Sequence, residues 1–167
     1  MEATMTRSKL LDDLKKFIAD AVKDFQLPTS LQKGDTTIEV RAPEVHKMRL
    51  PNARDYKKVA PYILIQFTTG TDKQTHGKQS DSNAMIRLIF CVYCDNEEEG
   101  AMHLLNVMDA VRIRLLKRVV VGEQFKLDTD AGLDSVVYTD DTAPYYAGEM
   151  IGTFLLPPIE REVSYEY

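Results

Sequence analysis

Residues 84–118 have the sequence AMIRLIFCVYCDNEEEGAMHLLNVMDAVRIRLLKR, and this stretch decides the fold. Its first eleven residues are almost all apolar and are rich in β-branched and aromatic types, which favours a buried strand over Ala84–Cys94. Side chains alternate between the two faces of a strand, so one face carries Ile86, Leu88, Phe90, Val92 and Cys94. We expect this face to pack under a helix.

The acidic run that follows predicts the start of that helix. Asp95 and Asn96 are good N-cap residues with a glutamate three positions later, and acidic groups stabilise the positive end of a helix. The spacing predicts a helix from about Glu97 to Arg118 whose apolar stripe is Ala101, Leu104, Leu105, Met108, Val111 and Leu115. Basic residues fill its last turns, where they complement the carbonyl end and also offer a charged contact surface: Arg112, Arg114, Lys117 and Arg118.

A second amphipathic helix is predicted from Leu10 to Phe25, with Pro28 as its stop signal. Shorter β-type runs surround the two helices, separated by Asp, Gly and Pro turns. They cover residues 36–41, 45–50, 61–69, 119–121, 124–127, 135–139 and 145–156. Runs of strands with one helix in the middle of the chain predict an α+β fold, a mostly antiparallel sheet packed against two main helices in a single domain spanning 1–167.

Composition excludes several classes of protein. Lys and Arg number 21 and Asp and Glu 26, so the net charge of −5 disfavours specific nucleic-acid binding. No run approaches the roughly 18 apolar residues that a membrane span needs, so no membrane partner is expected. The first residues lack the pattern of a secretory signal, which predicts folding in a reducing cytoplasm with unpaired cysteines.

The segment 68–83 is predicted to be a long polar loop, because it contains no aliphatic or aromatic side chain. Loops of this length inside a compact domain are usually functional or disordered, and the sequence leaves both open. As a partner-binding arm it offers candidate interface residues Thr71, Asp72, Lys73, His76 and Lys78. A different class of function, a small-ligand module or enzyme, would use the loop as a lid over a pocket near His76, Lys78 or Asp81.

Motifs for catalysis or cofactors are incomplete. Gly70, Gly77 and Lys78 are wrongly spaced for a phosphate loop and precede a strand instead of a helix. Cys91 and Cys94 lie three apart on a strand, so they are expected to be buried small hydrophobes, and the histidines show no metal-ligand spacing to them. The calcium-like run 128–134 has its glycine one position early. We therefore expect no enzyme activity, cofactor or metal.

The segment Ile86–Leu116 resembles phage and prophage proteins of the tail terminator, or tail completion, family. The shared features are a strand ending in an aromatic residue and an acidic cluster, then glycine and a helix, matched here by Tyr93, Asp95, Gly100 and 111–116. The segments 61–67 and 147–162 are also similar, so the resemblance covers about half of the chain. Cys94 departs from the Thr, Ser or other small polar residue expected at its position.

The resemblance implies an α/β subunit without catalytic residues that forms a ring, usually a hexamer. Such a ring caps the head-proximal end of the tail tube in the virion, ends tube polymerisation and docks the head or neck. The implied partners are other copies of the chain, the tail tube protein and a head/neck connector protein, with assembly in the host bacterial cytoplasm. Another connector or neck component is the alternative. The terminal segment 160–167, with Glu160 and Arg161 as candidate interface residues, either lies on a ring face or is flexible.

Overall fold

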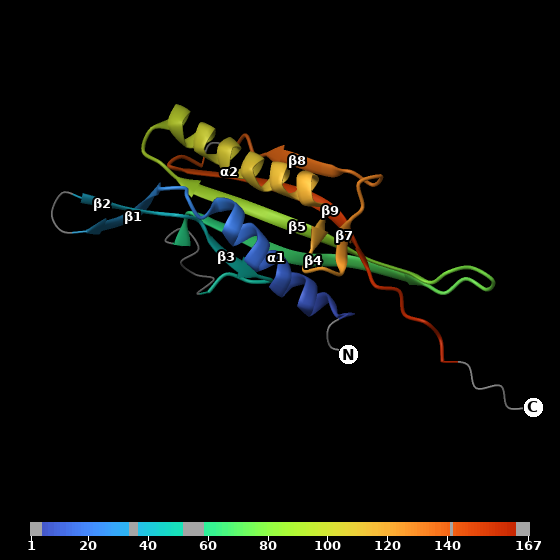
Figure 1. The fold of residues 1–167 in the computed structure, drawn as a ribbon. Helices are drawn as coiled ribbons and strands as arrows, with labels where there is room; N and C mark the ends of the chain where they lie inside the picture. Colours follow the sequence, from blue (N-terminus) through green and yellow to red (C-terminus); the bar gives the residue numbers. More distant parts are fainter. Residues whose placement is uncertain (1–4, 34–36, 52–58, 141, 163–167) are drawn as a thin grey trace, which may run out of the picture.

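The computed structural model describes residues 5–33, 37–51, 59–140 and 142–162 and has the predicted α+β fold. Two helices pack on a curled, mostly antiparallel sheet (Figure 1). The strand order is β3-β4-β5-β9-β7-β6, with β8 also paired to β9. No helix among the described residues combines the length and apolar character that crossing a membrane requires.

The central strand and its helix agree with the sequence prediction. β5 (Asp81–Tyr93) lies between β4 (Tyr62–Lys73) and β9 (Tyr145–Leu156), antiparallel to both. The predicted helix-facing side chains from Ile86 to Val92 are all buried in the main core. On the other face Cys91 joins a smaller cluster with Ala60, Tyr62 and Leu64. The sheet therefore carries a large core under the helices and a small one behind them.

The helix α2 (Glu97–Arg118) has the predicted bounds, and its N-cap is Asn96, whose side chain accepts a hydrogen bond from the Glu99 backbone N–H at 3.1 Å. Two positions of the predicted stripe are wrong: Ala101 and Leu105 are exposed, and Val107 is buried instead. Both errors have the same cause. An α-helix has 3.6 residues per turn, and the face of α2 that is buried is rotated slightly from the face that the sequence pattern predicted.

The first helix, α1 (Arg7–Val22), starts before and ends sooner than predicted. Thr6 caps it by accepting a hydrogen bond from the Lys9 backbone N–H. The predicted core face is confirmed, with Leu10, Leu11, Leu14, Ile18 and Val22 buried. Pro28 does not border the helix; it lies in an unpredicted strand, β1 (Leu27–Lys33), opposite Val40 of β2 (Thr37–Arg41). Thr36, predicted as the start of that second strand, lies outside the described residues.

The predicted long loop 68–83 is mostly strand. Residues 69–73 of β4 pair with 81–85 of β5, and a register shift after Phe67 marks a bulge, so only residues 74–80 connect the two strands. Residues 82–85 of this paired part also pair with 153–156 of β9, so the connection 74–80 is the part that reaches beyond the sheet (Figure 1). We call residues 69–85 the arm. Polar composition did not exclude this pairing because a β-ladder is made by backbone groups and leaves exposed side chains free to be polar.

The remaining strands are short. β3 (Glu44–Lys47) is parallel to β4, the exception to the antiparallel order, and ends before the predicted limit at Leu50. β6 (Val120–Val121) and β7 (Phe125–Leu127) form a hairpin directly after α2. β8 (Leu133–Val137) starts two residues earlier than predicted and pairs with residues 148–152 in the middle of β9.

Candidate functional site

The arm residues predicted as an interface divide into two groups. Thr71, Asp72 and Lys73 lie on β4, whereas His76 and Lys78 lie in the connection 74–80. All five are exposed. The base of the arm is anchored, because Arg7 Nη2 lies 3.1 Å from Asp72 Oδ2 and the Gln74 side chain donates a hydrogen bond to the Ile159 carbonyl at 3.0 Å.

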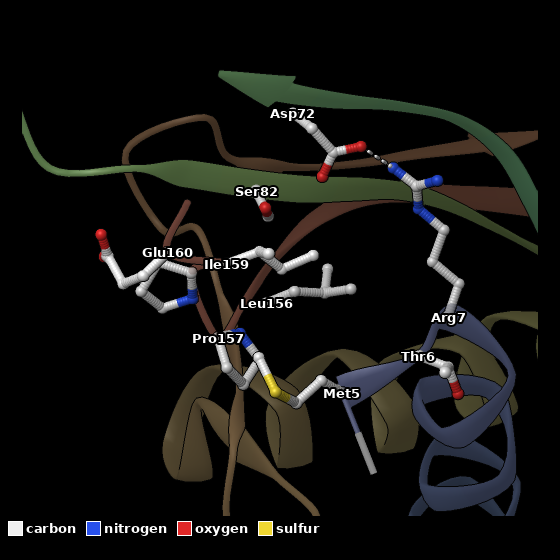
Figure 2. Close-up of a pocket in the computed structure, with 10 residues that line it drawn as sticks. Met5, Thr6, Arg7, Asp72, Ser82, Leu156, Pro157, Ile159 and Glu160 are labelled. Atoms are coloured by element: carbon white, nitrogen blue, oxygen red, sulfur yellow. Dashed lines mark hydrogen bonds and ion pairs between the residues drawn. The ribbon is translucent and has the colours of Figure 1, made fainter. Parts of the chain in front are cut away.

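A pocket with a volume of about 590 Å³ lies at this anchored base. The start of α1, the arm and the segment after β9 line it (Figure 2). Met5, Leu156 and Ile159 supply apolar surface, and the Arg7–Asp72 ion pair lies at its edge. Glu160 lines this pocket, while Arg161 is exposed beyond it.

This pocket does not have the geometry that a lid requires. His76, Lys78 and Asp81 are not among its lining residues, and the tip of the arm extends away from the body of the molecule (Figure 1). Arg7 is held by several contacts, since its guanidinium also lies 4.9 Å from the centre of the Phe67 ring and 3.4 Å from the Asn83 carbonyl. We therefore interpret the pocket as a junction of the arm with both ends of the described chain.

The predicted basic cluster at the end of α2 is not one continuous surface. Arg112 lies 3.0 Å from Asp109 on the same helix, and Arg114 Nη1 lies 2.8 Å from Asp20 Oδ2 of α1. Lys117 and Arg118 are exposed. Half of the cluster therefore serves contacts within the chain, and the structure does not bring it together with the arm residues into a single site.

The ion pair of Asp20 with Arg114 predicts a pH dependence of stability. Hydrogen bonds from Arg114 and then Lys23 lower the pKa of Asp20. A carboxyl group with a lowered pKa stabilises the fold above its ordinary pKa of about 3.9, and this contribution is lost as the pH falls through the lowered value. Urea unfolding at a series of pH values from 7 downwards measures this contribution. We expect Asp20→Asn to reduce stability slightly at pH 7 and this deficit to shrink steadily as the pH falls below about 4. A deficit that stayed constant over the whole series would contradict this assignment.

Sequence reasoning missed an exposed apolar stripe on α2. Met102, Leu105, Ile113 and Leu116 are each 43–51% exposed, and their spacings of 3, 8 and 3 residues place them on one side of the helix. This side is opposite the buried face formed by Leu104, Val107, Met108, Val111 and Leu115. The signal was present in the sequence, because α2 carries more large apolar residues than a single buried stripe can use.

A second exposed apolar surface lies on β2, where Ile38 and Val40 are 45% and 51% exposed. Both point to the same side, since they are two residues apart on a strand. The β1–β2 pair is a separate two-stranded sheet that extends from one end of the molecule (Figure 1). The described part of the chain therefore presents apolar surfaces on α2 and on β2, and Val136, Val137 and Tyr138 add exposed apolar side chains on and just after β8.

The structure also brings together three side chains of metal-binding types at the junction of β5 and α2. The ligand atoms of Cys94, Glu99 and His103 all lie within 4.8 Å of one another. Both cysteines are unpaired and buried, as the sequence suggested. Cys91 is on the small core and burial raises the pKa of its thiol to about 11, so at neutral pH it is protonated.

Gly100, part of the family resemblance, has a packing role here. A Cβ at this position would overlap the Tyr146 ring of β9, so glycine lets the first turn of α2 approach the sheet closely. This close approach also fixes the position of Glu99, the neighbouring residue, relative to the end of β5.

Comparisons with known proteins give little similarity. No protein-family model matches the sequence, and no curated protein is similar to it. Among solved structures, the chain is similar to one described as the virion of a native gene transfer agent (GTA) particle, with a TM-score of 0.39 and 8% sequence identity over 67% of this chain and 77% of that chain. A likeness of this size does not by itself assign a function.

Proposed function

We propose that this chain is a structural virion protein that forms a ring, capping the head-proximal end of a phage tail tube and providing the docking surface for the head or neck. The sequence resemblance to tail terminators motivates the proposal. The observation that carries it is the pair of exposed apolar surfaces, the stripe on α2 and the Ile38–Val40 side of β2.

A closed ring needs two different, complementary surfaces on each subunit, because its contacts are head-to-tail. The α2 stripe and β2 meet this requirement, since both are apolar and lie on different elements. In the proposed ring, β2 of one subunit packs on the α2 stripe of the next. Burial of apolar side chains would then drive association.

The arm has a different role in this proposal. Its tip is polar and extends beyond the sheet, so it suits a wet contact with the tube or neck better than a subunit core. Lys73 and Lys78 are exposed cations on this arm. The proposal therefore separates the residues that close the ring from those that bind other virion proteins.

Substitutions on each surface test the proposal. Leu105→Gln, Ile113→Gln and Leu116→Gln together, or Ile38→Gln with Val40→Gln, are expected to shift a hexamer to monomers in native mass spectrometry, with unchanged circular dichroism. The reason is that few buried side chains at an interface carry most of its binding energy. Lys73→Ser with Lys78→Ser is the control: it should keep the ring and weaken binding to purified tail tubes.

Other outcomes would count against the proposal. A wild-type chain that stays monomeric at high concentration and does not bind tail tubes would overturn it. A ring that survives both sets of glutamine substitutions would show that other surfaces close it. Cryo-electron microscopy of the particle would separate a terminator at the tube end from another neck component.

A further inference from the structure

Three side chains at the β5–α2 junction form a donor set for a metal ion. Cys94 follows the last residue of β5, while Glu99 and His103 lie in the first two turns of α2. Their sulfur, oxygen and nitrogen ligand atoms lie within 4.8 Å of one another. We propose that Cys94, Glu99 and His103 bind one Zn²⁺ ion, a property separate from the proposed ring assembly.

Local structure holds these three residues in place. Glu99 and His103 are four residues apart, so they lie next to each other on one side of the helix. Asn96 fixes the start of that helix, and the Cys94 backbone N–H donates a hydrogen bond to the Pro144 carbonyl at 2.9 Å. The donor set is therefore built by a strand end and a capped helix, both of which are parts of the folded core.

Burial and access are suited to an ion. Cys94 is only 6% exposed, His103 is half-buried and Glu99 is exposed, so the cluster is open to solvent on the Glu99 side. Among the described residues, neither Glu99 nor His103 takes part in an ion pair. The neighbouring Asp95 is engaged differently, since it accepts a hydrogen bond from the Tyr93 hydroxyl at 2.9 Å.

The donor types favour zinc over calcium or magnesium. Thiolate and imidazole are zinc ligands, whereas calcium and magnesium take oxygen ligands. In a tetrahedral zinc site the ligand atoms lie about 3.4–3.6 Å apart, given the usual zinc–ligand distances. The exposed Glu99 side chain can make this small contraction by changing its rotamer. Three protein ligands leave a fourth position, which water would fill.

The charges also balance. The N-terminus of α2 carries a partial positive charge that opposes a cation. A Cys94 thiolate and the Glu99 carboxylate together offset the charge of the ion, and binding releases the thiol proton to solvent.

Cobalt titration of the full, reduced chain tests the site, since Co²⁺ bound to a thiolate absorbs in the near ultraviolet. We expect one equivalent of Co²⁺ to produce this band and Zn²⁺ to remove it. Cys94→Ser should abolish the band, and His103→Ala or Glu99→Gln should weaken affinity about tenfold or more. Cys91→Ser and His76→Ala are the matched controls and should leave the titration unchanged.

The result that overturns the proposal is the absence of a band in the wild type, or a band that persists in Cys94→Ser. If Cys94→Ser fails to fold, His103→Ala decides the question, because this residue is only half-buried on α2 and its loss should not unfold the chain. In that variant, the same zinc concentration should raise the melting temperature less than it does in the wild type. A rise equal to that of the wild type would exclude the site.

Discussion

Replacing Phe90 with alanine is expected to lower the free energy of unfolding by about 3–5 kcal/mol. Phe90 is fully buried on β5, the strand that pairs with both β4 and β9, and it is opposite Ile63 on one side and Gly148 on the other. Removing its ring leaves a cavity in the core between the sheet and the helices, and the closely packed side chains around it cannot fully close it. Since a domain is typically stable by about 5–15 kcal/mol, this loss is a large fraction of the total.

Urea unfolding followed by circular dichroism measures this effect. Met85→Ala on the same strand is the matched control, because Met85 is 40% exposed and points to the other side of β5. Its expected cost is under about 1 kcal/mol, as for most surface substitutions. If the two variants unfolded at the same urea concentration, Phe90 would not be the centre of the core.

Replacing Gly122 with alanine is expected to lower the free energy of unfolding by about 2–5 kcal/mol, because two separate effects add. Gly122 lies in the turn between β6 and β7 with φ +60°, where a side chain costs about 1–2 kcal/mol. A Cβ there would also overlap the carboxylate of Asp13, which is buried on α1 and lies 2.9 Å from Lys9 Nζ. Such overpacking typically adds about 1–3 kcal/mol.

Gly132→Ala is the matched control, since Gly132 also has positive φ but no atom lies within 4 Å of the Cβ position. Gly132→Ala should therefore lower the free energy of unfolding only by the cost of placing a side chain at positive φ, about 1–2 kcal/mol. Thermal and urea unfolding of both variants, each also made with Asp13→Ala, give the coupling energy of the Gly122–Asp13 contact. If Gly122→Ala and Gly132→Ala lowered the free energy of unfolding equally, the β6–β7 turn would be able to move away from Asp13, and the predicted overlap would be wrong.

The candidate sites were predicted less completely than the fold. The exposed stripe on α2 was not predicted because Leu105 was assigned to the buried face. The sequence does not show which side of this helix the sheet covers. The Cys94–Glu99–His103 cluster was missed because sequence spacing alone does not bring Cys94 close to Glu99. The two side chains meet only because a strand ends just before Cys94 and a helix begins before Glu99. The basic residues Arg112 and Arg114 were found, but their partners Asp109 and Asp20 were not.

By itself, the sequence determined the elements whose burial follows a regular period: the helix-facing residues of β5, the bounds of α2 and the core face of α1. The hydrophobic period of a helix or strand shows which of its faces is buried, and this can be read without knowing which other elements pack against that face. Only the tertiary structure decided that 69–73 and 81–83 are paired strands, that Leu27–Lys33 is a strand and that β3 runs parallel to β4. These features depend on backbone hydrogen bonds between two segments of the chain, and side-chain patterns carry little information about such bonds.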